Sequence, residues 1–265
     1  MAMNEHAVQL ERLGAVAWVW LNRPAVHNAL NEELIEELTH TFHALGEDAE
    51  TRAIVLAGRG KSFCAGADLE SMRRLGAAGP VENLANAREL AEMYREIASS
   101  PKPTIARVNG AAIGGGLGLV SACDIAIAAR DAKFAASEVR LGLIPATISP
   151  YVVRAIGARW ARRLFQTAER ITAERAEKIG LVHEAVQPDD LNMRVDAVIG
   201  NLLAGAPGAQ KAAKELIEAV AEQPITPDLI EDTAVRIATI RSEAEAREGL
   251  NAFLEKRPAA WVPQP

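Results

Sequence analysis

The first part of the chain alternates between short strand-like runs and one amphipathic helical segment. Two β-rich runs, Val8–Leu13 and Val16–Leu21, flank Gly14-Ala15 and predict a β-hairpin. Asn31 then precedes apolar residues at helical spacing, which predicts a helix capped at its N-terminus. The short apolar run at residues 53–57 is typical of a buried strand.

The same alternation continues to about residue 190, and a different pattern follows. After a polar loop that follows Leu69 and runs through Pro80, the spacing predicts a long helix, several short strands and further helices. Past residue 189 the periodicity is helical throughout, with no strand pattern. The predicted elements are helices at 81–99, 115–122, 150–156 and 158–168, a helix capped by Thr172, strands at 104–108, 125–129 and 181–186, a strand and turn at 135–143, and tail helices at 189–204, 208–222, 228–241 and 242–256.

This pattern predicts an α/β core over residues 1–190 and an all-helical region over residues 191–265. The apolar stripes of the tail helices need a surface to pack on, so we expect a subunit interface there.

Composition narrows the classes of partner. Lys and Arg number 29 and Asp and Glu number 35, so the net charge is −6, which argues against nucleic acid or an anionic membrane as the main partner. The N-terminal residues lack the basic and apolar regions of a secretory signal. Two cysteines without metal-ligand spacing fit a reducing compartment, so we expect a cytoplasmic protein with no metal site.

Two Gly- and Ala-rich turns are the first candidates for chemistry. One covers residues 62–69 and the other residues 109–118, and each follows a predicted strand. Three consecutive glycines at a helix start leave N–H donors unpaired, which favours negative charge. The two turns are equally compatible with donors to a developing oxyanion and with tight packing in an alanine-rich core.

Glu138 is the third candidate, because it lies in an otherwise apolar strand and turn. A carboxylate there costs free energy unless it is paired or used in chemistry. Arg140 is the simplest structural partner for it.

Several short motifs occur in one order along the chain. They are Leu21-Asn22-Arg23-Pro24, Asn28-Ala29-Leu30, the run from Phe63 to Leu69, Asn109-Gly110, Gly114-Gly115-Gly116, Cys123-Asp124-Ile125, Phe134, Glu138, Leu141-Gly142-Leu143, Pro145 and the run from Phe253 to Arg257. Together they resemble the enoyl-CoA hydratase/isomerase (crotonase) superfamily over about residues 8–257. The resemblance implies a crotonase-like ββα spiral core and a C-terminal helical trimerisation region, in a homotrimer or a dimer of trimers.

The resemblance also implies a site for acyl-CoA thioesters. The backbone N–H groups of Ala67 and Gly115 would hold the thioester oxygen, and Glu138 would be the acid/base. Hydratases of this family usually carry a second glutamate at the position of Gly118, so this chain departs from the pattern. Ser121, Ser137 or a carboxylate on the substrate are the alternatives for holding the water.

Residues at the substrate follow from the same resemblance. Arg23 and Lys61 are candidates for CoA phosphate contacts, Lys256 and Arg257 for contacts with a neighbouring subunit's nucleotide, and Arg73 and Arg74 for a substrate carboxylate. No cofactor is expected, because coenzyme A enters as part of the substrate. The expected substrate-binding residues are Arg23, Ala65, Ala67, Asp68, Leu69 and Gly115.

The longest local match favours an enoyl-CoA hydratase, which adds water across the C2=C3 bond of an acyl-CoA thioester, and two alternatives remain open. The segments 116–124 and 137–150 look like those of bacterial hydratases of branched glutaconyl-CoA, which act in leucine or acyclic terpene breakdown. With a single carboxylate, Glu138 would also suit a Δ3,Δ2-enoyl-CoA isomerase. The loss of a carboxylate at Gly118 is compatible with a catalytically inactive, CoA-binding member of the family.

Overall fold

The computed structural model describes residues 6–263. Its main element is a six-stranded sheet in the order β1-β2-β3-β4-β6-β9, in which β1 pairs antiparallel with β2 and the other neighbours pair parallel. The predicted hairpin is therefore confirmed. The strands are β1 (Val8–Leu13), β2 (Val16–Leu21), β3 (Ala53–Gly58), β4 (Thr104–Val108), β6 (Ile125–Ala129) and β9 (Glu184–Val186).

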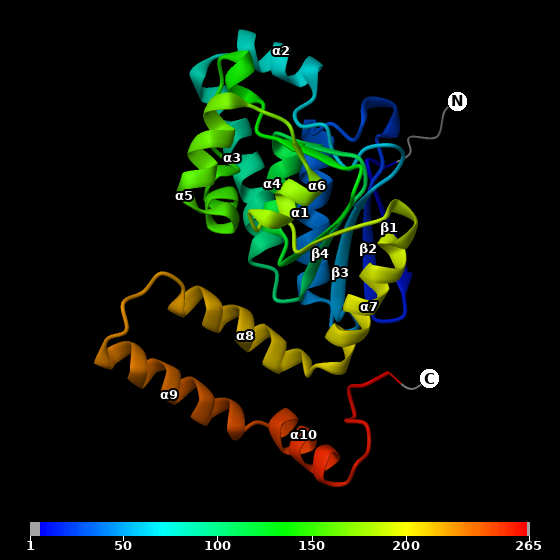
Figure 1. The fold of residues 1–265 in the computed structure, drawn as a ribbon, viewed down its shortest axis with the longest axis vertical. Coiled ribbons are helices and arrows are strands. Elements are labelled where there is room, and N and C mark those ends of the chain that lie inside the picture. The colour runs from blue at the N-terminus through cyan, green and yellow to red at the C-terminus, as the bar shows by residue number, and fades with distance from the viewer. Residues whose placement is uncertain (1–5, 264–265) are drawn as a thin grey trace.

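Side chains alternate between the two faces of this sheet, and each face packs on a core of its own, except along the largely exposed edge strand β1. Val19 and Leu56 point into the larger core, which α1 (Glu32–Glu47) and α3 (Pro80–Ala98) cover. Trp18 and Val55 point into a smaller core under α7 (Leu191–Ala204). Figure 1 shows α1 and α7 beside β2, β3 and β4.

A second, three-stranded sheet carries the rest of the core. It has the order β5-β7-β8 and packs with helices that follow its strands. The strands of this sheet and the helices that follow them are β5 (Ala111–Ile113), α4 (Gly115–Ala122), β7 (Lys133–Ala135), α5 (Ser149–Thr167), β8 (Ile171–Thr172) and α6 (Ala173–Lys178). Gly157, with φ 71° and ψ 158°, breaks α5 into the two helical pieces that the sequence predicts.

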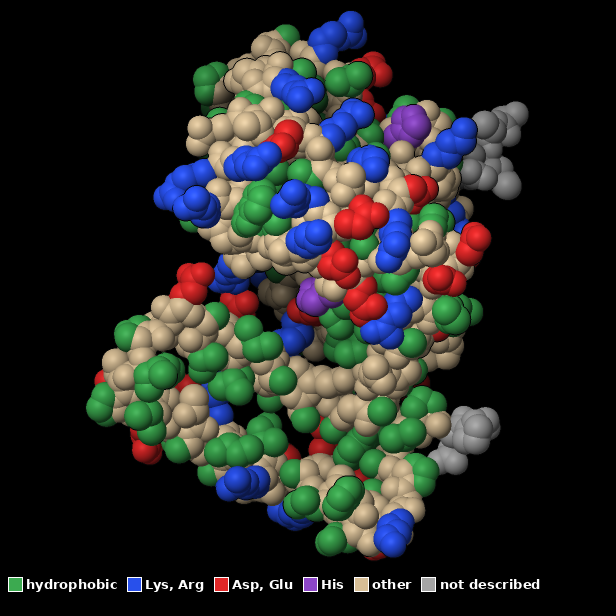
Figure 2. Space-filling model, in the orientation of Figure 1, with side chains coloured by type: hydrophobic (Ala, Val, Ile, Leu, Met, Phe, Trp, Pro, Cys, Tyr) green, Lys and Arg blue, Asp and Glu red, His purple; other side chains and the backbone are tan. Residues whose placement is uncertain are grey.

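Three helices, α8 (Pro207–Val220), α9 (Pro227–Arg241) and α10 (Ala244–Leu254), form an arm beside the core (Figure 1). The ion pairs Lys214–Asp124 (2.7 Å) and Arg154–Glu218 (2.8 Å) tie α8 to the core. Hydrophobic side chains spread over the arm, and the molecule is hollowed between arm and core (Figure 2). Phe253 is 82% exposed, so the arm leaves apolar surface uncovered.

Two element predictions are wrong. Residues 69–77 form the helix α2 (Leu69–Ala77) rather than a loop, because the Asp68 side chain accepts from the first backbone N–H groups and starts the helix. The strand predicted at 135–143 ends at Ala135, and the 3₁₀ turn η2 (Glu138–Leu141) replaces its second half. The helix α7, which follows the predicted division at residue 190, packs on the sheet with the core.

Candidate active site

The two Gly- and Ala-rich turns lie side by side. The backbone N–H of Cys64 donates to the carbonyl of Ala111 (2.9 Å), and the N–H of Ile113 donates to the carbonyl of Cys64 (3.0 Å). Gly66, at φ +100°, makes this approach possible, since a β-carbon there would lie 2.9 Å from the Ile113 oxygen and 3.8 Å from the Gly115 nitrogen. The turn at 62–69 thus ends next to the start of α4.

Ala67 and Gly115 each present a backbone N–H at this junction. Leu30 pairs with the chain on either side of Ala67: its N–H donates to the Gly66 carbonyl (2.7 Å) and its carbonyl accepts from Asp68 N–H (2.9 Å). The N–H of Ala67 therefore points away from Leu30. Gly115 opens α4, so its N–H has no partner within the helix. Neither N–H donates to another backbone group within residues 6–263.

Glu138 follows β7 and reaches the same junction. Its Oε1 lies 3.1 Å from the position of a β-carbon on Gly114, the residue before Gly115. Its Oε2 is buried and has no hydrogen-bond partner among the described residues. Burial raises the pKa of Glu138, although its own backbone amide acts to lower it. Arg140 does not pair with Glu138, so the simple ion-pair alternative is not what the structure shows.

The position of the second family glutamate is closed. A β-carbon on Gly118 would lie 2.3 Å from Ile148 Cγ2 and 2.9 Å from Tyr94 Cε1. Tyr94 is fully buried, and its hydroxyl donates to the carbonyl of Gly115 (2.9 Å). An aromatic ring and a branched aliphatic side chain therefore fill the space that a side chain at residue 118 would need.

A cavity of about 350 Å³ opens over the junction, and its volume falls within the range of small-molecule sites. It contains Glu138 and both N–H-bearing residues, and its remaining wall is mainly apolar. Helix α2, which the sequence did not predict, supplies part of this wall. The apolar lining includes Leu30, Ile35, Leu69, Met72, Leu75, Leu90, Leu141, Leu143, Ile144, Pro145 and Ile148.

The predicted substrate-binding residues fall into two groups. Ala65, Ala67, Leu69 and Gly115 line the cavity, and Leu69 is 77% exposed at its edge. Arg23 and Asp68 instead bind each other, with Arg23 Nη2 3.0 Å from Asp68 Oδ2. They lie in the adjoining hollow.

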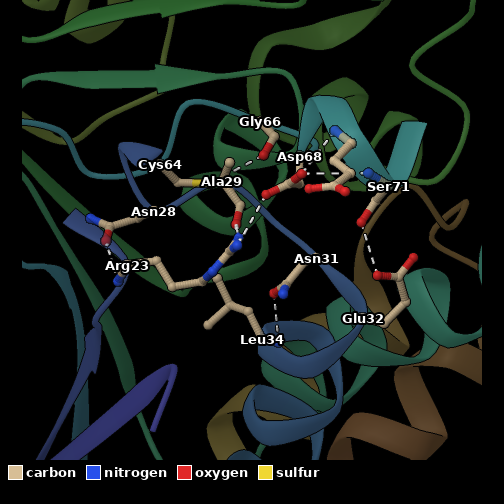
Figure 3. Close-up of polar contacts among 11 residues, drawn as sticks. Arg23, Asn28, Ala29, Asn31, Glu32, Leu34, Cys64, Gly66, Asp68 and Ser71 are labelled. Carbon is tan, nitrogen blue, oxygen red and sulfur yellow. Dashed lines mark hydrogen bonds and ion pairs between the residues drawn. The ribbon is translucent and has the colours of Figure 1, made fainter. Parts of the chain in front are cut away.

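Arg23 is engaged on both sides of its guanidinium (Figure 3). It donates to the carbonyl of Ala29 as well as to Asp68, and Asp68 Oδ1 accepts from the N–H of Glu70 (2.9 Å). Burial acts to raise the pKa of Asp68, but these donors outweigh it and hold the pKa below its usual range. The pair therefore anchors the chain directly after Ala67 to the segment before Leu30.

Asn28 is a positioning residue that the sequence analysis did not single out. It is fully buried, and its side-chain amide donates to the carbonyls of Ser62 (2.8 Å), Phe63 (3.0 Å) and Arg59 (2.9 Å). These bonds fix the start of the turn that carries Ala67. Asn28 belongs to one of the family motifs in the sequence, but its role becomes visible only from its contacts in the folded chain.

The remaining candidate cations are already paired or exposed, and Lys256 and Arg257 follow α10 in the arm and do not line the cavity. Arg74 pairs with Glu32 and with Glu82, and Arg257 pairs with Glu248. Over the part of the chain that the structure describes, no cluster of three His, Cys, Asp or Glu side chains could hold a metal ion. In the same residues no helix is long and apolar enough to cross a membrane.

The sequence and the fold are similar to those of known proteins. The chain belongs to the enoyl-CoA hydratase/isomerase family, whose model matches residues 11–264. It is 33% identical over 261 residues to the short-chain-enoyl-CoA hydratase of Clostridium acetobutylicum, covering 96% of this chain and 97% of that one. It is 35% identical over 264 residues to the crotonyl-CoA hydratase of Syntrophomonas wolfei, with 96% of each covered.

A solved structure agrees with the fold. The crystal structure of an enoyl-CoA hydratase from Shewanella pealeana superposes with a TM-score of 0.94 at 41% identity, covering 97% of this chain and 96% of that one. The predicted fold class, a crotonase-like α/β core with a C-terminal helical region, is confirmed.

Proposed function

We propose that this protein is an enoyl-CoA hydratase, which adds water across the C2=C3 bond of an acyl-CoA thioester. The observation that carries the proposal is the junction of Glu138 with the N–H groups of Ala67 and Gly115 in an apolar cavity. The hydratase names of relatives at about one-third identity support it.

The two N–H groups would bind the thioester oxygen. When water attacks C3, charge moves to that oxygen, and two fixed donors stabilise the resulting enolate in a mainly apolar cavity. One donor of this kind contributes roughly 2.7–4 kcal/mol to the transition state. The N-terminus of α4 adds a favourable electrostatic field for the same charge.

Glu138 would move the proton. As a carboxylate it takes a proton from the attacking water while the oxygen–C3 bond forms. As a carboxylic acid it then gives that proton to C2, which returns the enolate to a thioester. Burial raises the pKa of Glu138, which makes its acidic form easier to reach than that of a glutamate in water.

The cavity favours an uncharged acyl chain. Neither Lys nor Arg is among the described residues that line it, and Arg74 nearby is held by Glu32 and Glu82. A branched glutaconyl-CoA is the more specific substrate that the sequence suggests. Its extra carboxylate would need a cation, for which Arg73, exposed on α2 beside the lining residue Met72, is the available candidate.

A Δ3,Δ2-enoyl-CoA isomerase is the second candidate. The closed space at Gly118 favours it, because one carboxylate is enough to carry a proton between C4 and C2. Separate incubations with crotonyl-CoA, 3-methylglutaconyl-CoA and a 3-enoyl-CoA distinguish the candidates. The hydratase proposal expects 3-hydroxyacyl products from at least one 2-enoyl thioester, and turnover of the 3-enoyl thioester alone would contradict it.

We also propose that the arm assembles the protein into a homotrimer or a dimer of trimers. Ile225 is 86% exposed and Phe253 82% exposed, which is unusual for large apolar side chains on a monomer. Light scattering should give three or six chains. A monomer at micromolar concentration would contradict this assembly.

A further inference from the structure

Hydration needs a water molecule held beside C3, and the family's usual second carboxylate has no space here. Ile148 and Tyr94 fill the position that a side chain at Gly118 would take. Another group must therefore orient the water. This inference rests on the proposed function, because an isomerase would need no such group.

The hydroxyl groups that line the cavity are few. Ser71, Tyr94, Ser137 and Thr147 supply them. Ser71 Oγ donates to Glu32 Oε2 (2.8 Å), so its proton is already used in a hydrogen bond at the mouth of the cavity. Tyr94 is fully buried and donates to the Gly115 carbonyl, so solvent does not reach it.

Ser121, the serine one turn after Gly118, lies on the side of α4 that faces away from the cavity. Its hydroxyl donates to the carbonyl of Leu117 (2.9 Å). It lines a separate hollow with His183 and Glu218, between the core and the arm. Ser121 therefore cannot contact a water in the candidate site.

Of the two cavity hydroxyls that remain, Ser137 and Thr147, Ser137 is the one next to Glu138, and it faces the same point. Apart from Gly114 and its neighbours in the chain, the three heavy atoms nearest to a β-carbon on Gly114 are Glu138 Oε1 (3.1 Å), Glu138 Cδ (3.7 Å) and Ser137 Oγ (3.8 Å). Within residues 6–263 the Ser137 hydroxyl makes no hydrogen bond, and the residue is half-buried in the cavity wall. Two polar atoms converge on one point beside the residue that precedes the donor Gly115.

We propose that Ser137 Oγ and the Glu138 carboxylate together hold the water that attacks C3. The water donates one O–H to Glu138 and the other to Ser137 Oγ, which leaves an oxygen lone pair for C3. As the oxygen–C3 bond forms, the C2=C3 electrons move to the thioester oxygen and the first proton passes to Glu138. Glu138 then protonates C2, so the sum is one water added, and Ser137 keeps its own proton throughout.

The proposal requires Ser137 for only one of two reactions of the same site. Exchange of the C2 protons of butyryl-CoA with D₂O needs Glu138 and the two N–H donors, but no attacking water. Hydration of crotonyl-CoA needs all of them and the oriented water. Ser137→Ala should therefore lower kcat for hydration about 10- to 100-fold, change KM little, and leave C2 exchange within about twofold of the wild-type rate.

Ser121→Ala is the matched control, because it removes a serine hydroxyl from the far side of α4 and should leave both rates unchanged. Retained exchange in Ser137→Ala shows that the fold and the N–H donors are intact. Hydration within twofold of wild type, or an equal loss of hydration and exchange, overturns the proposal. Absence of exchange in the wild type overturns it as well, because Glu138 would then not face C2. A wild type that hydrates no 2-enoyl thioester instead refutes the proposed function itself.

Discussion

Tyr94 covers Gly118, so that a β-carbon on Gly118 would lie 2.9 Å from Tyr94 Cε1. The Tyr94 hydroxyl is held at the same time by the carbonyl of Gly115, 2.9 Å away. The ring cannot withdraw from Gly118 without breaking this bond next to a proposed oxyanion donor. The structure around α4 is thus built for a glycine at residue 118.

Gly118→Ala should therefore destabilise the protein. The added methyl group would meet Ile148 Cγ2 at 2.3 Å as well as the Tyr94 ring. Overpacking of this kind costs about 1–3 kcal/mol, and urea unfolding followed by circular dichroism measures it. Gly200→Ala in α7 is the control, since a β-carbon there meets no atom within 4 Å and should add about 0.4–1 kcal/mol. Equal stability of the two variants would contradict this packing.

Asp68→Ala should loosen the turn that carries Ala67. The change removes the cap of α2 and the partner of Arg23, and we expect the free energy of unfolding at pH 7 to fall by about 1–2 kcal/mol. The folded-state pKa of Asp68 is lowered, so its contribution is complete above pH 3.8 and is lost as the pH falls through the folded pKa. The difference between wild type and variant in urea unfolding should shrink accordingly.

The control for this prediction is Asp131→Ala. Asp131 is exposed, and among the described residues its side chain makes no hydrogen bond or ion pair. Its removal should change the free energy of unfolding by less than about 0.5 kcal/mol, both at pH 7 and at a pH below the folded-state pKa of Asp68. An Asp68 variant as stable as the Asp131 variant would show that the Arg23–Asp68 pair does not anchor the turn.

Glu138→Gln should make the protein relatively more stable at higher pH. Burial raises the folded-state pKa of Glu138 above 4.5, so the folded state binds more protons than the unfolded chain in the window between these two values. The contribution of Glu138 to stability is therefore complete below pH 4.5 and is lost as the pH rises through the folded pKa.

The glutamine variant lacks this loss. Urea unfolding of wild type and Glu138→Gln at pH 5 and pH 8 should show the stability difference moving in favour of the variant at pH 8. A difference that does not depend on pH, or one that moves toward the wild type, would mean that Glu138 is not buried as the structure places it.

Local signals in the sequence were enough for most of the fold. The β-rich runs around Gly14-Ala15 predict the hairpin, and Asn31 predicts a helix start that the structure confirms through its bond from Leu34 N–H. The helix α2 was missed because its apolar face is short and a glycine follows it closely, so only the capping contact of Asp68 reveals it.

Contacts between distant segments were beyond the sequence. Tyr94 lies within the helix predicted at 81–99, and nothing in its spacing shows that its ring faces Gly118 or that its hydroxyl reaches Gly115. Ser121 and Ser137 were equal candidates for holding a water. They separate only when α4 is placed in three dimensions, with Ser121 turned away from the cavity.

Hydration of crotonyl-CoA in D₂O by the wild type and by Glu138→Gln tests the central claim most directly. The wild type should form 3-hydroxybutyryl-CoA with a single deuterium at C2, as mass spectrometry can show. The variant, lacking the proton-transferring group, should be slower by about 10²- to 10⁴-fold while still binding the thioester. A Glu138→Gln variant that hydrates crotonyl-CoA at the wild-type rate would contradict the account.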